Sequence, residues 1–163
     1  MINQLERNYK VQKLLAEIAL HLNSVDDFDS KINEVLRIIG SSLNVCRVYI
    51  FEDFNNGANC KNTFEWCAND VEPQIENLKN VSYTDDVSVV ETYFEKYGCV
   101  EVEDVSVLPT DFRMFLENQG IKSVIIHPLY INDQRFGFIG LDETKQNRPW
   151  TISEKNLLET TSG

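Results

Sequence analysis

The sequence predicts an α+β domain built around an antiparallel β-sheet. Two runs rich in β-branched and aromatic residues, 121–130 and 134–143, flank the tripeptide Ile131-Asn132-Asp133. Asn and Asp tolerate positive φ, so this tripeptide predicts a tight turn between adjacent antiparallel strands. Hairpin-linked strands with helical patterns near both ends of the chain are typical of an α+β domain. Both faces of the hairpin are largely apolar, so we expect its strands to be covered on both sides.

Composition and charge exclude several classes of protein. The 163 residues fit one domain with a sizeable core, and 42% of them are hydrophobic. A formal net charge of −11 argues against binding nucleic acid or an anionic membrane, because both recruit Lys and Arg. No apolar run is long enough to cross a bilayer, and the N-terminus lacks the apolar core of a signal peptide. We therefore expect a cytoplasmic protein whose domain contacts neither membrane nor nucleic acid.

Two amphipathic helices are predicted before the first strand. Residues 5–22 carry apolar side chains at the spacing of one buried helical stripe, and residues 28–39 repeat this pattern. Ser24 or Asp26 is expected to cap the second helix, and Gly40 is expected to end it.

The first pair of strands is predicted at residues 46–52 and 62–67, joined through the turn signal Asn55-Asn56-Gly57. Side chains of the first strand alternate between two faces, with Val48 and Ile50 on one and with Arg47, Tyr49 and Phe51 on the other.

The middle of the chain is predicted to be irregular and partly helical. Residues 68–83 are expected to be mostly loop, followed by helical residues 86–97 and a strand at 99–102. A short helix at 111–118 is expected to start at a Thr110 cap. These segments should cover one face of the sheet and could enclose a pocket.

The C-terminal residues begin another helix. Thr151 and Glu154 form a capping box, in which each side chain bonds the backbone of the other residue. Barely two helical turns follow before Gly163, so we expect the chain to be a fragment of a longer protein.

Three segments in order resemble the GAF domain, a small-molecule-binding and signalling module of many sensor proteins. They are CRVYIFED at 46–53, the hairpin VIIHPLYINDQRFGFIGLDE at 124–143, and W-T-x-x-E at 150–154. The segment FEWCANDVEPQIENLKNVSY at 64–83 is similar to those of bacterial and archaeal multidomain sensor histidine kinases. Residues 1–163 are therefore identified as a single GAF domain.

This resemblance implies a GAF-like fold, related to the profilin-like and PAS folds. It has a six-stranded antiparallel sheet, with the terminal helices on one face and a pocket covered by loops and helices on the other. Residues 1–23 would form an N-terminal signalling helix, and residues 151–163 would start a truncated C-terminal linker helix. Both would run into adjacent signalling domains, which we expect to be those of a histidine kinase, and would form a parallel homodimer. An unknown small-molecule ligand would change the output of an attached domain through these helices. It could do so only if it bound two arrangements of the helices with different affinity.

Six side chains are candidates for the wall of such a pocket: Arg47, Tyr49, Phe51, Glu65, Cys67 and His127. Arg47 could pair with an anionic group, whereas Glu65 beside the ring of Trp66 could hold a cationic or planar ligand. His127 is the leading candidate, as a hydrogen-bond donor, a haem ligand or a pH-sensitive group. The alternative for each is a structural role, as a buried or satisfied side chain. The other histidine, His21, is expected on a distant helix, so no metal site is predicted.

Two other functions stay open beside the non-catalytic sensor. A redox enzyme of the free methionine sulfoxide reductase type would use Cys60, Cys67 and Cys99, although their local sequence does not resemble that enzyme's motifs. A degenerate GAF domain would bind nothing and serve only as a dimerisation spacer. The four cysteines have no C-x-x-C spacing, which indicates reduced thiols rather than zinc ligands. The sequence has neither the adjacent Cys and His that attach a bilin nor the signature of cyclic-nucleotide-binding GAF domains, so no cofactor is predicted. The domain by itself is predicted to be a sensor and not an enzyme.

Overall fold

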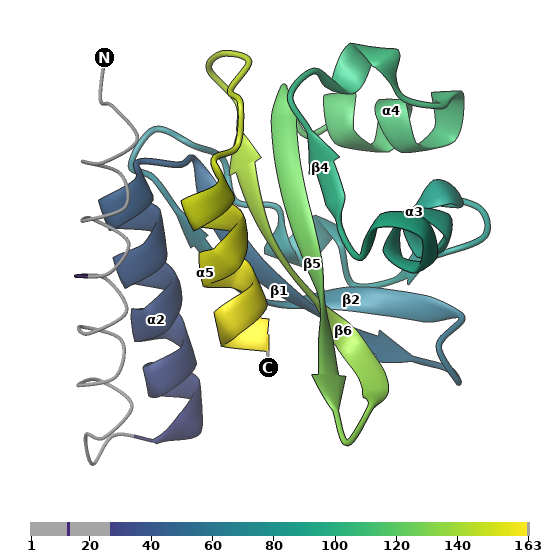
Figure 1. Cartoon of the computed structure of the whole chain (residues 1–163), viewed down its shortest axis with the longest axis horizontal. Coiled ribbons are helices and arrows are strands. Elements are labelled where there is room, and N and C mark those ends of the chain that lie inside the picture. Colours follow the sequence, from purple (N-terminus) through teal and green to yellow (C-terminus); the bar gives the residue numbers. More distant parts are fainter. Residues whose placement is uncertain (1–12, 14–26, 163) are drawn as a thin grey trace.

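The predicted α+β architecture is confirmed by the structure, a computed structural model that describes Lys13 and residues 27–162 (Figure 1). Its six strands form one antiparallel sheet in the order β3-β2-β1-β6-β5-β4. They are β1 (Arg47–Phe54), β2 (Asn59–Cys67), β3 (Val81–Ser82), β4 (Val100–Val102), β5 (Ser123–Ile131) and β6 (Gln134–Glu143). The helix predicted for residues 5–22 lies, apart from Lys13, outside the described residues.

The hairpin that led the sequence prediction lies in the middle of the sheet, because β6 pairs with both β1 and β5. Asn132 and Asp133 join its strands with φ values of 52° and 64°. Positive φ at both central residues is the geometry of a type I′ turn, whose twist matches that of the flanking strands. The predicted turn is confirmed.

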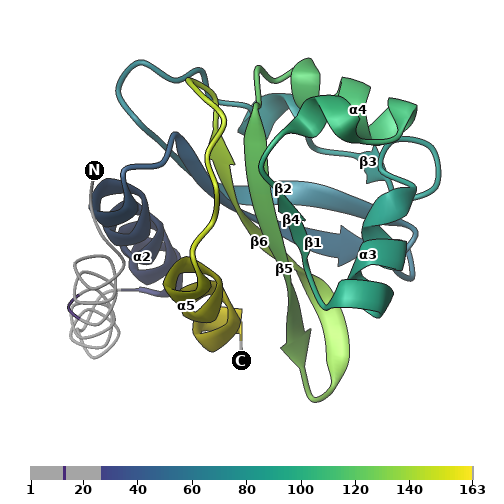
Figure 2. The same ribbon diagram turned by 45° about the horizontal axis from the view of Figure 1, so that its top comes forward.

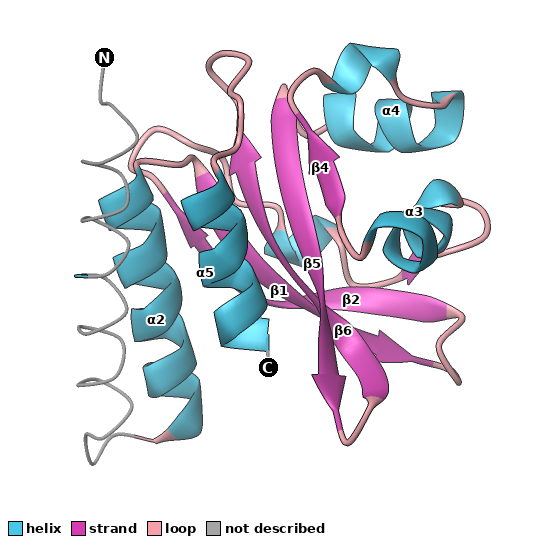
Figure 3. Ribbon diagram, viewed as in Figure 1, coloured by secondary structure: helices cyan, strands magenta, loops and turns pink. Residues whose placement is uncertain are grey.

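Helices cover both faces of the sheet and divide the interior into two cores (Figures 1 and 2). One face carries α2 (Phe28–Leu43) and α5 (Ile152–Ser162), which lie side by side over the central strands. We call this side the helix face. The opposite side, here the pocket face, carries α3 (Val89–Tyr97), α4 (Thr110–Glu117) and two short 3₁₀ turns, η1 (Ile75–Asn77) and η2 (Val105–Val107) (Figure 3). Val48 belongs to the core of the helix face, while Tyr49 and Phe51 belong to that of the pocket face, as the alternation in β1 predicted.

Both predicted ends of α2 are wrong, and packing explains the second. Asp27, rather than Ser24 or Asp26, caps the helix by accepting a hydrogen bond from the Ser30 N–H at 2.9 Å. The helix continues through Gly40 to Leu43, and Asn44 ends it in the left-handed conformation. Gly40 is needed for another reason: a Cβ there would overlap Cε3 and Cζ3 of the Trp66 ring.

Replacing Gly40 by alanine is expected to destabilise the protein, although alanine is the better helix former by about 1 kcal/mol. The added methyl must displace the Trp66 ring, and overpacking of this kind costs about 1–3 kcal/mol, so the packing term wins. We expect a net loss of about 1 kcal/mol in urea unfolding. The matched control is Ser41→Ala, at the exposed neighbouring position, which should gain a few tenths of a kcal/mol. A Gly40→Ala protein more stable than the wild type would contradict this account.

Some short strands and helix ends differ from the prediction, because the hydrophobic pattern of a few residues carries little information about structure. β2 starts at Asn59 instead of residue 62, and the two-residue strand β3 falls inside the predicted loop at 68–83. Thr110 does not cap α4, since Pro109 occupies the cap position and makes no side-chain cap bond. The capping box of α5 is confirmed: Glu154 accepts from the Thr151 N–H at 2.9 Å, and Thr151 Oγ1 accepts from the Glu154 N–H at 3.1 Å. Among the described residues, no helix combines the length and the apolar character that crossing a membrane requires.

Candidate functional site

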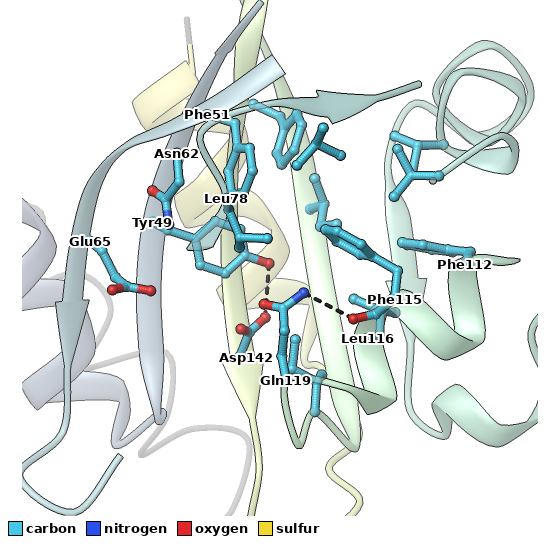
Figure 4. A pocket seen from close by; sticks show the side chains of 16 residues that line it. Tyr49, Phe51, Asn62, Glu65, Leu78, Phe112, Phe115, Leu116, Gln119 and Asp142 are labelled. Carbon is cyan, nitrogen blue, oxygen red and sulfur yellow. Dashed lines mark hydrogen bonds between the residues drawn. The ribbon is translucent and has the colours of Figure 1, made fainter. Parts of the chain in front are cut away.

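A pocket lies on the pocket face, between the sheet and the segments that cover it (Figure 4). Most of its wall is apolar, with aromatic rings from β1, β6 and α4. Its polar side chains gather at one end, and they are Tyr49, Asn62, Glu65, Gln119 and Asp142. The centre of a water-sized sphere can occupy only about 20 Å³ of it, which corresponds to about one water molecule.

A β-bulge in β2 assembles part of this polar end. Phe51 pairs with Asn62 while Ile50 pairs with Phe64, so Thr63 is an extra residue that reverses the alternation of the strand. Its hydroxyl donates to the Ile50 carbonyl at 3.4 Å. In an uninterrupted strand Asn62 and Glu65 would point to opposite faces, but across the bulge both line the pocket.

A buried ion pair closes the polar end between β1 and β6. Nη1 of Arg47 lies 3.3 Å from Oδ2 of Asp142, and the hydroxyl of Tyr49 donates to Oδ1 of the same carboxylate at 2.8 Å. The guanidinium also donates from Nε to the carbonyl of Glu72 and from Nη2 to that of Gln119, both at 3.0 Å. Arg47 therefore fastens two covering segments to the sheet.

Burial shifts the pKa values of two groups at this end of the pocket, Asp142 and Tyr49. It raises the pKa of the Asp142 carboxyl to about 7, although the charge of Arg47 and the hydrogen bond from Tyr49 oppose the shift. Burial, together with the charge of Asp142, raises the pKa of Tyr49 well above its ordinary value, so this hydroxyl stays a donor.

The raised pKa of Asp142 predicts a pH-dependent stability. The folded protein holds this proton more tightly than the unfolded chain, so the stabilisation is complete below about pH 4 and is lost as the pH rises through 7. The amide of an Asp142→Asn variant has no such proton to lose. Between pH 5 and 8 we expect the wild type to lose about 2 kcal/mol relative to that variant, measured by urea unfolding. Parallel pH profiles of the two proteins would contradict the assignment.

Glu65 and Asn62 connect the pocket with the segment that contains η1. The Glu65 carboxylate accepts from the backbone N–H groups of Gln74 and Ile75 at 3.0–3.2 Å. The backbone N–H of Asn62 donates to the Leu78 carbonyl at 2.8 Å. Within the part of the chain that the structure describes, the side-chain oxygen Oδ1 of Asn62 is buried without a hydrogen-bond partner, and the residue is only 1% exposed.

The structure brings five of the six predicted residues to the pocket face and separates the sixth. Tyr49, Phe51 and Glu65 line the pocket, and their contact with a ligand stays a prediction. Arg47 lies behind Asp142, where each of its three side-chain nitrogens donates one hydrogen bond to a protein acceptor. Cys67 follows Glu65 on the same face of β2, beyond the lining residues, and burial raises its pKa to about 12.

His127, the leading candidate, does not line the pocket. It shares one face of β5 with Ile125 and Leu129, which belong to the core of the helix face. Burial lowers its pKa, and the negative charge of Glu159 in α5 opposes this effect. For Trp66 the structure supports the alternative of a structural role, since its ring packs on the helix face against Gly40. The sequence of β5 is apolar on both faces, so it does not show whether His127 faces the pocket or the helices. For Trp66, the bulge reverses the alternation in the second half of β2.

The cysteines do not form a common site in the described part of the chain. Cys60 and Cys67 lie seven residues apart on β2, about 23 Å along the strand, and Cys99 precedes β4 at the opposite sheet edge. A disulfide requires Cα atoms within about 7 Å. Burial raises the pKa of Cys60 to about 12 and also raises that of Cys99, so these thiols stay protonated. This placement does not favour the redox alternative. Across the described residues, no group of His, Cys, Asp and Glu side chains is arranged to hold a metal ion.

Sequence reasoning missed three residues of the polar end: Asn62, Gln119 and Asp142. For Asp142 a signal existed, because a carboxylate at the end of the apolar run FGFIGLD needs a partner when it is buried. Asn62 and Gln119 could not be found in this way, since a bulge and a loop place them.

Comparisons with known proteins agree with this architecture. A family model described as the GAF domain matches residues 27–163. A "Methanogenesis regulatory histidine kinase FilI" of Methanothrix harundinacea is 34% identical over 143 residues, which cover 84% of this chain and 16% of that protein. The chain thus spans about one-sixth of the length of this curated relative.

Solved structures share the fold at low sequence identity. The phycocyanobilin-bound GAF domain of a cyanobacterial phytochrome matches with a TM-score of 0.77 and 15% identity, covering 93% of this chain and 89% of that one. The GAF domain of an Acinetobacter phosphoenolpyruvate-protein phosphotransferase matches with a TM-score of 0.68 and 13% identity, covering 100% and 90%. The pocket of this chain has room for about one water molecule, and none of its described lining residues is a cysteine. The family match and the identity to the kinase show that this chain belongs to the GAF domain family.

Proposed function

We propose that this GAF domain is a non-catalytic sensor module of a cytoplasmic signalling protein, of the histidine kinase class, and that its pocket binds a small molecule. The observation that carries the proposal is the polar end of the pocket. There a buried ion pair and Oδ1 of Asn62, which has no hydrogen-bond partner among the described residues, lie next to an apolar wall. Buried polar groups at the end of an apolar pocket are typical of small-molecule sites. The identity to a regulatory histidine kinase supports the class of the parent protein.

The same strands connect the pocket with the helices that would carry the signal. In β1, Tyr49 faces the pocket while Val48 packs on the helix face, and β6 is divided in the same way. Arg148 joins the two helices, because its Nη2 donates to the Leu43 carbonyl at the end of α2 at 2.9 Å and to Glu154 of α5 at 2.6 Å. A ligand that favours one position of these strands would shift the helices as a pair, and a homodimer through the terminal helices would pass the change to neighbouring domains.

A thermal-shift screen of a metabolite library, combined with native mass spectrometry of the protein purified from its own cells, tests the ligand. We expect at least one metabolite to raise the unfolding midpoint, because a ligand that binds only the folded state stabilises it. Sedimentation and crosslinking of a longer piece that includes the neighbouring domain test the dimer. A strict monomer with no adduct and no responding metabolite would overturn the proposal.

A second candidate function is that of a dimerisation spacer that binds nothing. The small volume of the pocket favours it, since only about 20 Å³ is open to the centre of a water-sized sphere. A dimer in sedimentation together with a flat metabolite screen would select this candidate over the sensor.

A further inference from the structure

The end of β6 carries two buried carboxylates on adjacent residues, which point to opposite faces of the sheet. Asp142 lines the pocket, and Glu143 faces the helices, since successive side chains of a strand alternate. They are 1% and 5% exposed. The start of β1 provides a partner for each: Arg47 pairs with Asp142 at 3.3 Å, and the thiol of Cys46 donates to Oε1 of Glu143 at 3.6 Å.

On the pocket face, Arg47 connects Asp142 to the segments that cover the pocket. Its guanidinium donates to the carbonyl of Glu72, which precedes η1, and to that of Gln119, which precedes β5. The Tyr49 hydroxyl donates to the other oxygen of the Asp142 carboxylate, and Figure 4 shows the two side chains together at the polar end. A buried ion pair is stabilising only while its geometry is good, so a shift of either covering segment changes the environment of Asp142.

On the helix face, Arg148 connects Glu143 to both helices. Oε2 of Glu143 lies 3.7 Å from Nη1 of Arg148. The same guanidinium donates to the carbonyls of Leu43 and Asn44 at the end of α2, and to the carboxylate of Glu154 in the first turn of α5. The ends of β6 and α2 and the start of α5 therefore meet at one side chain.

The backbone of β6 holds the two carboxylates together. Asp142 pairs with Arg47 of β1, and Glu143 pairs with Ser123 of β5, so this end of β6 is bonded on both sides. The Cys46 N–H donates to the Asp142 carbonyl at 2.9 Å, and the N–H before Ser123 donates to the Glu143 carbonyl at 2.8 Å. A close-packed interior transmits a displacement instead of absorbing it, so Asp142 and Glu143 move together.

We propose that Asp142 and Glu143, at the end of β6, couple the cover of the pocket to the junction of α2 and α5. A change that weakens the contacts of Asp142 weakens those of Arg148 with the helices. The reverse also holds, because coupling between two sites is reciprocal. This inference rests on the proposed sensor function and names the part of the sheet through which an occupied pocket would act on the helices.

Tyr49→Phe tests the coupling from the pocket to the helices, because it removes one hydrogen bond to Asp142 and little volume. Exchange rates of single backbone amides are measured by NMR in the ligand-free chain. They are normalised to the slowest amides, which report global unfolding. We expect the N–H groups of Val45, after α2, and Lys155, in the first turn of α5, to exchange about fivefold faster on this scale.

The matched control for this experiment is Tyr83→Phe. Tyr83 is as buried as Tyr49 and belongs to the same core, but its hydroxyl donates to Asp53 instead of Asp142. This variant should change the normalised rates by less than about twofold, because its site shares no hydrogen bond with the end of β6.

Arg148→Lys tests the opposite direction. Lysine keeps the charge, but its single ammonium group cannot hold the two helices and Glu143 at once. We expect about fivefold faster normalised exchange at the N–H groups of Asn62 and Ile121, which bond the covering segments on the pocket face. The matched control is Arg135→Lys, at the other end of β6, where the arginine also pairs with two carboxylates. It should leave both rates within about twofold.

Glu143→Gln tests whether the coupling passes through β6. The amide keeps the size of the side chain and removes the charge that pairs with Arg148. In this background, Tyr49→Phe should change the normalised rates of Val45 and Lys155 by less than about twofold.

Several results would overturn the inference. They are unchanged normalised rates at Val45 and Lys155 in Tyr49→Phe, equal acceleration in Tyr83→Phe, an effect in one direction only, or an effect that Glu143→Gln leaves undiminished. A metabolite that binds the chain, together with any of these results, would leave the sensor function intact. A metabolite screen without any binder would remove the sensor function, whereas reciprocal acceleration would still establish the coupling.

Discussion

Replacing Arg47 by methionine is expected to lower the free energy of unfolding by about 3–5 kcal/mol at pH 8. The change removes the cation next to Asp142, which is 1% exposed and has only Tyr49 as a remaining side-chain partner among the described residues. An unpaired carboxylate in a core is costly, so the protein must either keep the charge or take up a proton. The substitution also removes the hydrogen bonds that Arg47 donates to the carbonyls of Glu72 and Gln119 on the covering segments.

The pH dependence of this cost identifies its cause. Burial already raises the pKa of Asp142 to about 7 with Arg47 present, and loss of the guanidinium charge raises it further. At pH 6 the carboxyl of the variant is therefore neutral, and the cost should be clearly smaller than at pH 8. Urea unfolding at both values of pH provides the measurement.

Two further variants complete the experiment on Arg47. Arg113→Met removes an exposed i,i+4 pair with Glu117 and should change the stability by less than about 0.5 kcal/mol. The double variant Arg47→Met with Asp142→Leu removes both charges, and we expect it to recover most of the loss, since apolar replacements of a buried pair are often neutral. A double variant no more stable than Arg47→Met alone would show that the ion pair is not the source of the cost.

The general fold was predictable because its signals are local. Asn132 and Asp133 specify their turn by tolerating positive φ, and the alternation of Val48 with Tyr49 places the two faces of β1. Thr151 and Glu154 form their capping box within four residues of each other. Each of these features depends on neighbours in the sequence, so it could be identified before any tertiary contact was known.

The polar end of the pocket depends on contacts that sequence patterns do not contain. Arg47 was correctly placed on the pocket face. The anionic group that it binds is the carboxylate of Asp142, which is 95 residues away in the sequence, and not a ligand. Asn62 escaped prediction because the bulge at Thr63 reverses the alternation of β2. Gly40 was interpreted as a helix end, whereas the close approach of Trp66 across the helix face requires it. In each case a tertiary contact overrode a local rule.

Gly140 in β6 is expected to be as important for the site as the charged residues. It lies opposite Tyr49 in the pairing of β1 with β6, and a Cβ at this position would overlap Cε2 of that tyrosine and lie 2.5 Å from its hydroxyl oxygen. The absence of a side chain therefore lets the Tyr49 ring lie across β6 and reach Asp142. Sequence alone presents this glycine only as a break in an apolar strand.

Gly140→Ala is expected to lower the free energy of unfolding by about 3 kcal/mol. Overpacking against a fully buried ring accounts for about 1–3 kcal/mol, and the lost hydrogen bond from Tyr49 to Asp142 adds about 1 kcal/mol or more. The same change in a Tyr49→Leu background should cost at least about 1.5 kcal/mol less, because leucine leaves room for the methyl group. Urea unfolding of the four proteins measures this coupling. Equal losses of unfolding free energy in the two backgrounds would mean that the methyl group clashes with β1 or β6 and not with the Tyr49 ring. A smaller loss in the Tyr49→Leu background would mean that Gly140 makes room for this ring. The glycine then positions the Tyr49 hydroxyl that donates to Asp142 at the polar end of the pocket.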